Sequence, residues 1–141
     1  MYRLFNLSLG KVFSFAGLSL CLVACQPPSP KQLPTASHSF AAQQIKLKMP
    51  IEPIPLEQRV KLTLELPDRV KPGLGNVEGV SMYMGSIPLQ WKQTDTGKWQ
   101  ADLYLGSCTE PRMTWRLTVP LQSEFDDLPA QISLNFESVA N

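Results

Sequence analysis

Histidine is almost absent from this sequence, which has one, His38, among its 141 residues. Imidazole is the side chain that most often serves as a general base near neutral pH. The sequence also lacks a glycine-rich phosphate loop, an H-E-x-x-H metal motif and a G-x-S-x-G nucleophile elbow. Its adjacent carboxylates, Asp126 and Asp127, stand in the turn-like segment EFDDLP, where such pairs are usually solvated. We therefore predict a protein that is not an enzyme.

An excess of charge of one sign is missing as well. From residue 44 onward, ten lysines and arginines stand against twelve aspartates and glutamates, a formal net charge of −2. A run or patch of basic residues usually marks a contact with nucleic acid or with an anionic membrane. No such run is present in the linear sequence, which therefore indicates neither contact, and we expect no nucleic acid among the partners.

Long apolar runs are missing outside the N-terminal region. There, VFSFAGLSLCLVA at residues 12–24 follows the basic residues Arg3 and Lys11. This stretch is too short to span a bilayer by itself. A basic head followed by a short apolar stretch is typical of a secretory signal, so we predict that residues 1–24 are a signal peptide.

The predicted signal ends in Leu22-Val23-Ala24-Cys25, which resembles the lipobox of bacterial lipoproteins. The resemblance implies that Cys25 becomes the new N-terminus, with its thiol alkylated by a diacylglyceryl group and its amine acylated by a fatty acid such as palmitate. Two or three acyl chains hold a protein stably on a membrane. Gln26 stands where an aspartate would resemble the inner-membrane retention signal, so we expect the outer membrane, facing the periplasm. The alternative is a plain secretory signal or an uncleaved anchor.

Cysteine is scarce in the remaining chain. Cys21 leaves with the predicted signal and Cys25 carries the lipid, so Cys108 is the one thiol of the folded part. No internal disulfide is then available, and the hydrophobic core must hold the domain together. A single thiol in an oxidising compartment is a buried inert group, an intermolecular bridge, or a reactive or metal-binding group.

The segment QPPSPKQLPTASHSFAAQ, residues 26–43, is rich in proline, serine and glutamine and poor in large apolar residues. Such a composition cannot bury enough surface to offset the entropy of ordering. We therefore predict that residues 25–43 are the lipidated cysteine and a disordered linker, which would reach roughly 50 Å when extended. The folded domain is then expected at residues 44–141.

Apolar and polar residues alternate through residues 44–141, as they do in half-buried strands. A short connection that contains Gly97 separates two of these stretches and predicts a hairpin. The predicted strands are IKLKM (45–49), RVKLTLELP (59–67), VEGVSMYM (77–84), SIPLQWKQ (86–93), KWQADLYL (98–105), MTWRLTVPLQ (113–122) and AQISLNF (130–136).

About seven short strands and no helical period predict an all-β fold, a single immunoglobulin-like β-sandwich, with a small barrel as the alternative. The Cys…Trp…Cys spacing of antibody domains is absent, so only the architecture is predicted. Pro88 and Pro120 fall inside strand patterns, and we expect each on an edge strand or at a bulge, because proline cannot donate to the ladder.

Four sulfur-bearing side chains could meet in this fold. Met82 and Met84 share a face of their predicted strand, and Cys108 lies in a loop just before Met113. Cu(I) favours thioether and thiolate ligands, so these four residues would form a Cu(I) site if the two segments are neighbours. The alternative is core packing, where methionine and free cysteine are common, and where Val80 would share the face of Met82 and Met84.

Aromatic residues offer a second kind of site. Tyr83 and Tyr104 have the parity opposite to their apolar strand neighbours, so we expect them to be exposed and to contact a partner. Trp91 and Trp99 flank the predicted hairpin. They would either form an exposed patch for a protein or a glycan, since such residues anchor interfaces, or fill the core.

The combination G-x-x-M-Y-M-G-x-I-P followed by LGSCTEP-x-M-x-W, over residues 79–115, resembles small uncharacterised membrane-anchored lipoproteins of proteobacteria. That resemblance implies no established activity. We predict a non-catalytic binding or accessory module, without a cofactor, for a protein complex of the cell envelope. The alternative is a Cu(I)-binding accessory protein in copper handling or in the assembly of a respiratory oxidase.

Overall fold

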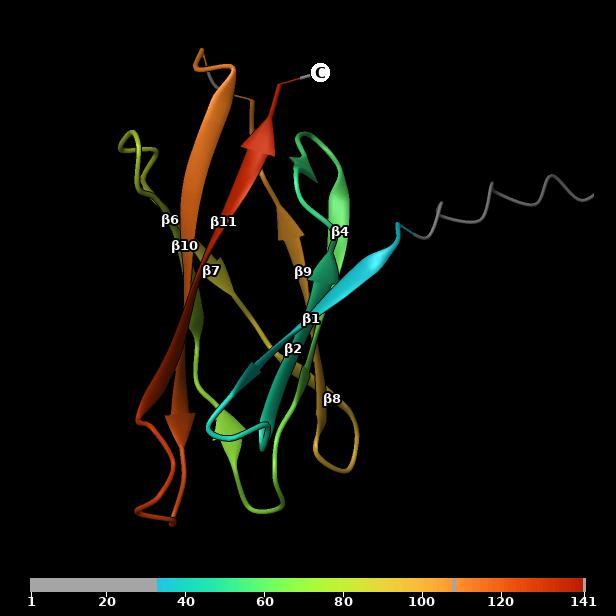
Figure 1. The fold of residues 1–141 in the computed structure, drawn as a ribbon, viewed down its shortest axis with the longest axis vertical. Helices are drawn as coiled ribbons and strands as arrows, with labels where there is room; N and C mark the ends of the chain where they lie inside the picture. Colours follow the sequence, from blue (N-terminus) through green and yellow to red (C-terminus); the bar gives the residue numbers. More distant parts are fainter. Residues whose placement is uncertain (1–32, 108, 141) are drawn as a thin grey trace, which may run out of the picture. The chain divides into compact units, whose positions relative to one another are not determined.

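The computed structural model describes residues 33–107 and 109–140, which form eleven β-strands in two sheets and no helix. One sheet has five strands in the order β1-β2-β4-β9-β8. The other has the order β3-β11-β10-β6-β7, with β5 paired to one end of β10. The sheets lie face to face (Figure 1). The strands are β1 (Thr35–Phe40), β2 (Ile45–Pro50), β3 (Ile54–Pro55), β4 (Arg59–Glu65), β5 (Lys71–Pro72), β6 (Gly75–Gly79), β7 (Ser86–Leu89), β8 (Lys92–Asp95), β9 (Lys98–Tyr104), β10 (Arg112–Gln122) and β11 (Gln131–Val139).

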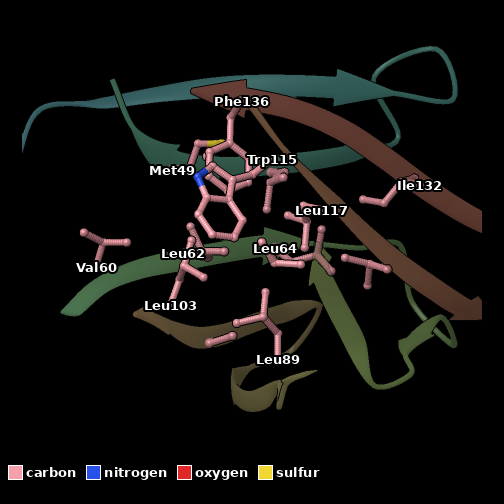
Figure 2. Close-up of a cluster of buried hydrophobic side chains, with 14 of the residues drawn as sticks. Met49, Val60, Leu62, Leu64, Leu89, Leu103, Trp115, Leu117, Ile132 and Phe136 are labelled. Carbon is pink, nitrogen blue, oxygen red and sulfur yellow. The ribbon is translucent and has the colours of Figure 1, made fainter. Parts of the chain in front are cut away.

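Alternation within the strands produces one hydrophobic core between the sheets. Buried and exposed positions alternate along all of β4 and β10, because successive side chains of a strand point to opposite faces. Trp115 and Phe136 of one sheet lie among side chains of the other (Figure 2). The indole Nε1–H of Trp115 donates to the buried Ser138 Oγ at 2.8 Å. The largest side chain of the core is therefore buried without an unpaired polar atom.

The two sheets confirm the prediction of an all-β sandwich, and an immunoglobulin-like arrangement is compatible with them. A hairpin is present at the predicted turn: β8 and β9 are antiparallel and joined by Thr96 and Gly97, whose φ of +67° suits glycine. Its first strand differs from the predicted strand 86–93, because residues 86–89 form β7 of the other sheet and β8 begins at Lys92. The strands number eleven rather than about seven. Two of the additional ones, β3 and β5, have only two residues each and lack an alternation long enough to read.

The segment predicted as a linker contains strand β1. Thr35–Phe40 pairs antiparallel with β2, and Phe40 packs against the core. Composition missed this strand because its small polar residues occupy the outer positions of an edge strand, where no large apolar side chain is needed. The turn that follows gave no signal either, since Ala41, Ala42 and Gln43 adopt positive φ in place of glycine.

The two prolines are accommodated differently. Pro88 lies in β7, an edge strand, as predicted. Pro120 lies inside β10, which has neighbours on both sides. It stands at the break between β6, whose pairing with β10 ends at Thr118, and β5, whose pairing begins at Leu121. Its missing N–H therefore costs no ladder hydrogen bond, while its carbonyl accepts from Gly73 N–H at 2.8 Å.

Candidate functional site

Three loops and the end of β11 gather at one end of the sandwich, which we call the loop end (Figure 1). The loops are the β3–β4 connection (56–58), the β6–β7 loop (80–85) and the β9–β10 loop (105–111). Glu57 N–H donates to Leu105 O at 2.8 Å, and Ser107 Oγ–H to the Glu57 carboxylate at 2.9 Å. These bonds tie the first and third loops together.

The loop 80–85 is held against the start of β10. Ser81 Oγ accepts from Thr114 N–H at 3.1 Å and donates to Met113 Sδ at 3.4 Å, and Val80 N–H donates to Thr114 O at 2.8 Å. The loop then folds back over Gly79, where a Cβ atom would lie 2.1 Å from the Met82 carbonyl oxygen. Only glycine allows this approach. Ser81 was not predicted as part of the site, although it stands directly before the two methionines in the sequence.

The predicted strand 77–84 is wrong beyond Gly79, where β6 ends. Val80 is 45% exposed and does not share a buried face with the methionines. The tight return of the chain over Gly79 explains the difference, because it replaces the strand period with a loop. Within this loop, Met82 and Met84 are half-buried against the core, and Tyr83 between them is 88% exposed.

Two residues of the predicted sulfur cluster border the same glycine. Met113 is a core residue, 1% exposed, and its side chain and the Met82 backbone both adjoin Gly79. Met84 lies in the same loop as Met82, and Cys108 lies outside the described residues. Among residues 33–107 and 109–140, no three histidine, cysteine, aspartate or glutamate side chains gather as they would around a metal ion.

The predicted contact residues Tyr83 and Tyr104 are both exposed. Tyr104 is the last residue of β9, at the start of the β9–β10 loop, so both tyrosines belong to the loop end. Trp91 and Trp99 are half-buried and pack against the core, and neither indole N–H has a hydrogen-bond partner within the described chain. They are therefore mainly packing residues.

Two hollows lined by described residues lie away from the loop end. The first, of about 420 Å³, lies where β8 and β9 adjoin Pro88 of β7, and is lined by Lys61, Pro88, Gln90, Lys92, Thr94, Gln100, Ala101 and Asp102. The second, of about 100 Å³, lies beside Trp99 and the segment 67–71. Neither lining contains a histidine or a pair of carboxylates, the groups that general acid–base catalysis most often employs.

The predicted lipidation site Cys25 and the predicted signal also lie outside the described residues. Within the part that the structure describes, no helix is long and apolar enough to cross a membrane. No protein-family model, curated protein or solved structure matches this chain.

Proposed function

We propose that this chain is a lipid-anchored periplasmic lipoprotein of the outer membrane, whose sandwich is a non-catalytic binding module for a protein complex of the cell envelope. One observation carries the proposal: Tyr83 is 88% exposed at the loop end, although the loop that presents it is held by specific hydrogen bonds. An aromatic side chain on a fixed loop is a typical interface anchor.

The anchoring of the loop adds to the argument. Ordering a mobile loop on binding reduces affinity, whereas a loop already held in place avoids that loss. Val80 N–H and Ser81 Oγ both bond to the Thr114 backbone, and Val80 and Tyr83 are both exposed. Tyr104, 54% exposed at the end of β9, pairs with Arg59 on the outer face of the five-stranded sheet and is not part of this contact.

The membrane anchor is tested separately. Changing Cys25→Ser removes the thiol that the lipobox resemblance assigns to lipidation. We expect the precursor to remain uncleaved and unable to incorporate labelled palmitate, both of which gel electrophoresis detects. Normal processing of the variant would contradict the anchor.

The binding surface is tested by photo-crosslinking in intact cells. A photoreactive phenylalanine analogue at position 83 is expected to give a discrete product of one mass. Position 125 is the matched control, because Phe125 is an exposed aromatic, 42%, in the β10–β11 loop. Equal products from positions 83 and 125, or none from position 83, would overturn the assignment of the loop end.

A Cu(I)-binding accessory protein is the second candidate, favoured by the position of Met82 and Met113 beside Gly79. Replacing Met82→Leu and Met84→Leu together removes two thioethers and nearly preserves volume. Met49→Leu is the control, since Met49 is a buried methionine of β2. If copper binds here, anaerobic titration against a chelator shows saturable Cu(I) binding that is lost in the double variant and kept in the control. The absence of saturable binding by the wild type excludes this candidate.

A further inference from the structure

The outer face of the five-stranded sheet collects basic residues from four strands. Paired residues of a ladder lie on the same face. The register aligns Lys46, Glu65 and Lys98 in one row, then Lys48, Thr63, Gln100 and Lys92 in the next, followed by Lys61 with Asp102 and Arg59 with Tyr104. We call the six cations of these rows the basic face; they are Lys46, Lys48, Arg59, Lys61, Lys92 and Lys98.

Most of this positive charge is not neutralised. Lys48 pairs with Glu65 at 2.6 Å, while the other five cations form no ion pair with any residue that the structure describes. Three carboxylates, Glu65, Asp95 and Asp102, lie on or at the margin of the face. The six-stranded sheet differs, because on its outer face Arg112 pairs with Glu137 at 2.5 Å and Arg116 lies 3.9 Å from Glu78. The charge of the sandwich is therefore asymmetric.

The basic face borders the hollow of about 420 Å³. Lys61 and Lys92 line it together with the amide side chains of Gln90 and Gln100, the hydroxyl of Thr94 and one carboxylate, Asp102. Ammonium, amide and hydroxyl groups are the donors that phosphate oxygens accept from. The rest of the face is the surface of an open antiparallel sheet, which suits a broad, flat and anionic partner.

The position of β1 indicates that this anionic partner is a membrane surface. Strand β1 is the edge of this same sheet and begins at Thr35, so only residues 26–34 separate it from Cys25. Nine residues reach about 30 Å even when fully extended. A lipid on Cys25 would hold the sheet at high effective concentration beside the bilayer, where each lysine or arginine near an anionic surface contributes about 1 kcal/mol.

We propose that the basic face binds the anionic headgroups of the membrane that carries the protein, so that the five-stranded sheet lies on the bilayer. The proposal takes from the proposed function only the lipid anchor, which explains why the face is held near lipid. Its test uses the chain from Gln32 onward, without the anchor, so that failure of one does not imply failure of the other. This part has its own closed core, and circular dichroism verifies that it folds.

The experiment is co-sedimentation with two kinds of vesicle, one of neutral phosphatidylcholine and one of phosphatidylcholine mixed with phosphatidylglycerol. We expect binding to the anionic vesicles only, and its loss as salt is added, because salt screens exposed charges. Replacing Lys61→Gln and Lys92→Gln should weaken binding roughly twentyfold, as expected for two charges. Glu65→Gln should strengthen it roughly fivefold, which a misfolded variant would not do.

The matched control is Arg112→Gln with Arg116→Gln, which removes the same charge from the opposite sheet and should leave binding within about twofold. Equal binding to neutral vesicles, or equal loss in the control pair, would overturn the proposal. Binding to soluble polyglutamate without binding to anionic vesicles would also overturn it, and would identify the basic face as a site for an acidic protein.

Discussion

Gly79 shows how a single residue shapes the candidate site. The loop 80–85 can return over β6 only because no side chain stands between the backbone of Gly79 and the carbonyl of Met82. On the same side of the sheet, the Ser81 hydroxyl donates a hydrogen bond to Met113 Sδ. The packing of Met113 and the exposure of Tyr83 therefore both depend on the absence of a side chain at position 79.

We expect Gly79→Ala to destabilise the protein by about 2–4 kcal/mol, because the new Cβ would lie 2.1 Å from backbone that must move. Gly106→Ala is the control, since nothing lies within 4 Å of a Cβ at that position of the same end. Urea denaturation measures both. Similar stability losses in the two variants would show that the close approach over Gly79 carries no special cost.

Among the described carboxylates, Glu65 has a lowered pKa. The Lys48 ammonium, hydrogen-bonded at 2.6 Å, lowers the pKa of Glu65 below its ordinary value of 4.5, and the charges of Lys46 and Lys98 act in the same direction. A depressed folded pKa means that the charged carboxylate stabilises the fold above the unfolded pKa. That contribution is lost as the pH falls through the folded pKa.

Glu65→Gln should therefore be less stable than the wild type at neutral pH, by less than about 1 kcal/mol for such an exposed pair. The difference should disappear on acidification well below pH 4.5. Urea denaturation over a pH series measures this, with Glu110→Gln as the control at an exposed loop position. A difference that persists or grows in acid would contradict the assigned direction.

At the scale of the elements, alternation predicted the long strands and missed the short ones. β4, β10 and β11 were readable because seven or more alternating residues define a face. Strand β1 could not be read in this way, since most of its residues, in the sequence TASHSF, are small and polar, as they are in a linker. A strand of this kind is defined by its partner, β2, rather than by its own side chains.

Strand β1 makes a prediction about the domain boundary. A chain that begins at Gln44, the boundary predicted from composition, loses the β1–β2 ladder and the contact of Phe40 with the core. It should be less stable than a chain beginning at Gln32 by several kcal/mol, because β2 becomes an unprotected edge. Urea denaturation of both chains measures the loss. Equal stability would show that β1 is dispensable.

At the scale of the whole molecule, both sheets close one core around Trp115 and Phe136 (Figure 2). Neither sheet buries its apolar face without the other, so the sandwich should unfold as one cooperative unit. With Trp91→Phe and Trp99→Phe, the remaining indole reports on the core. We expect its fluorescence transition to coincide with the loss of far-ultraviolet circular dichroism. Separate midpoints would show that the sheets unfold independently.

The sequence by itself determined the fold class, the turn at Gly97 and the exposure of Tyr104, because these follow from the two-residue period and the turn preference of glycine. The lipobox at Cys25 and the non-catalytic function stay predictions. Both were predicted without reference to the fold, and the described residues test neither of them.

Only the tertiary structure decided where the loop 80–85 runs, that residues 35–40 form a strand, and that six cations share one face. Each of these depends on pairing between segments distant in the sequence. Lys46, Lys61 and Lys98 are spread along a chain of balanced charge, and no local pattern marks them. Strand register alone brings them together, because in a sheet the neighbours of a residue are set by the ladder and not by the sequence.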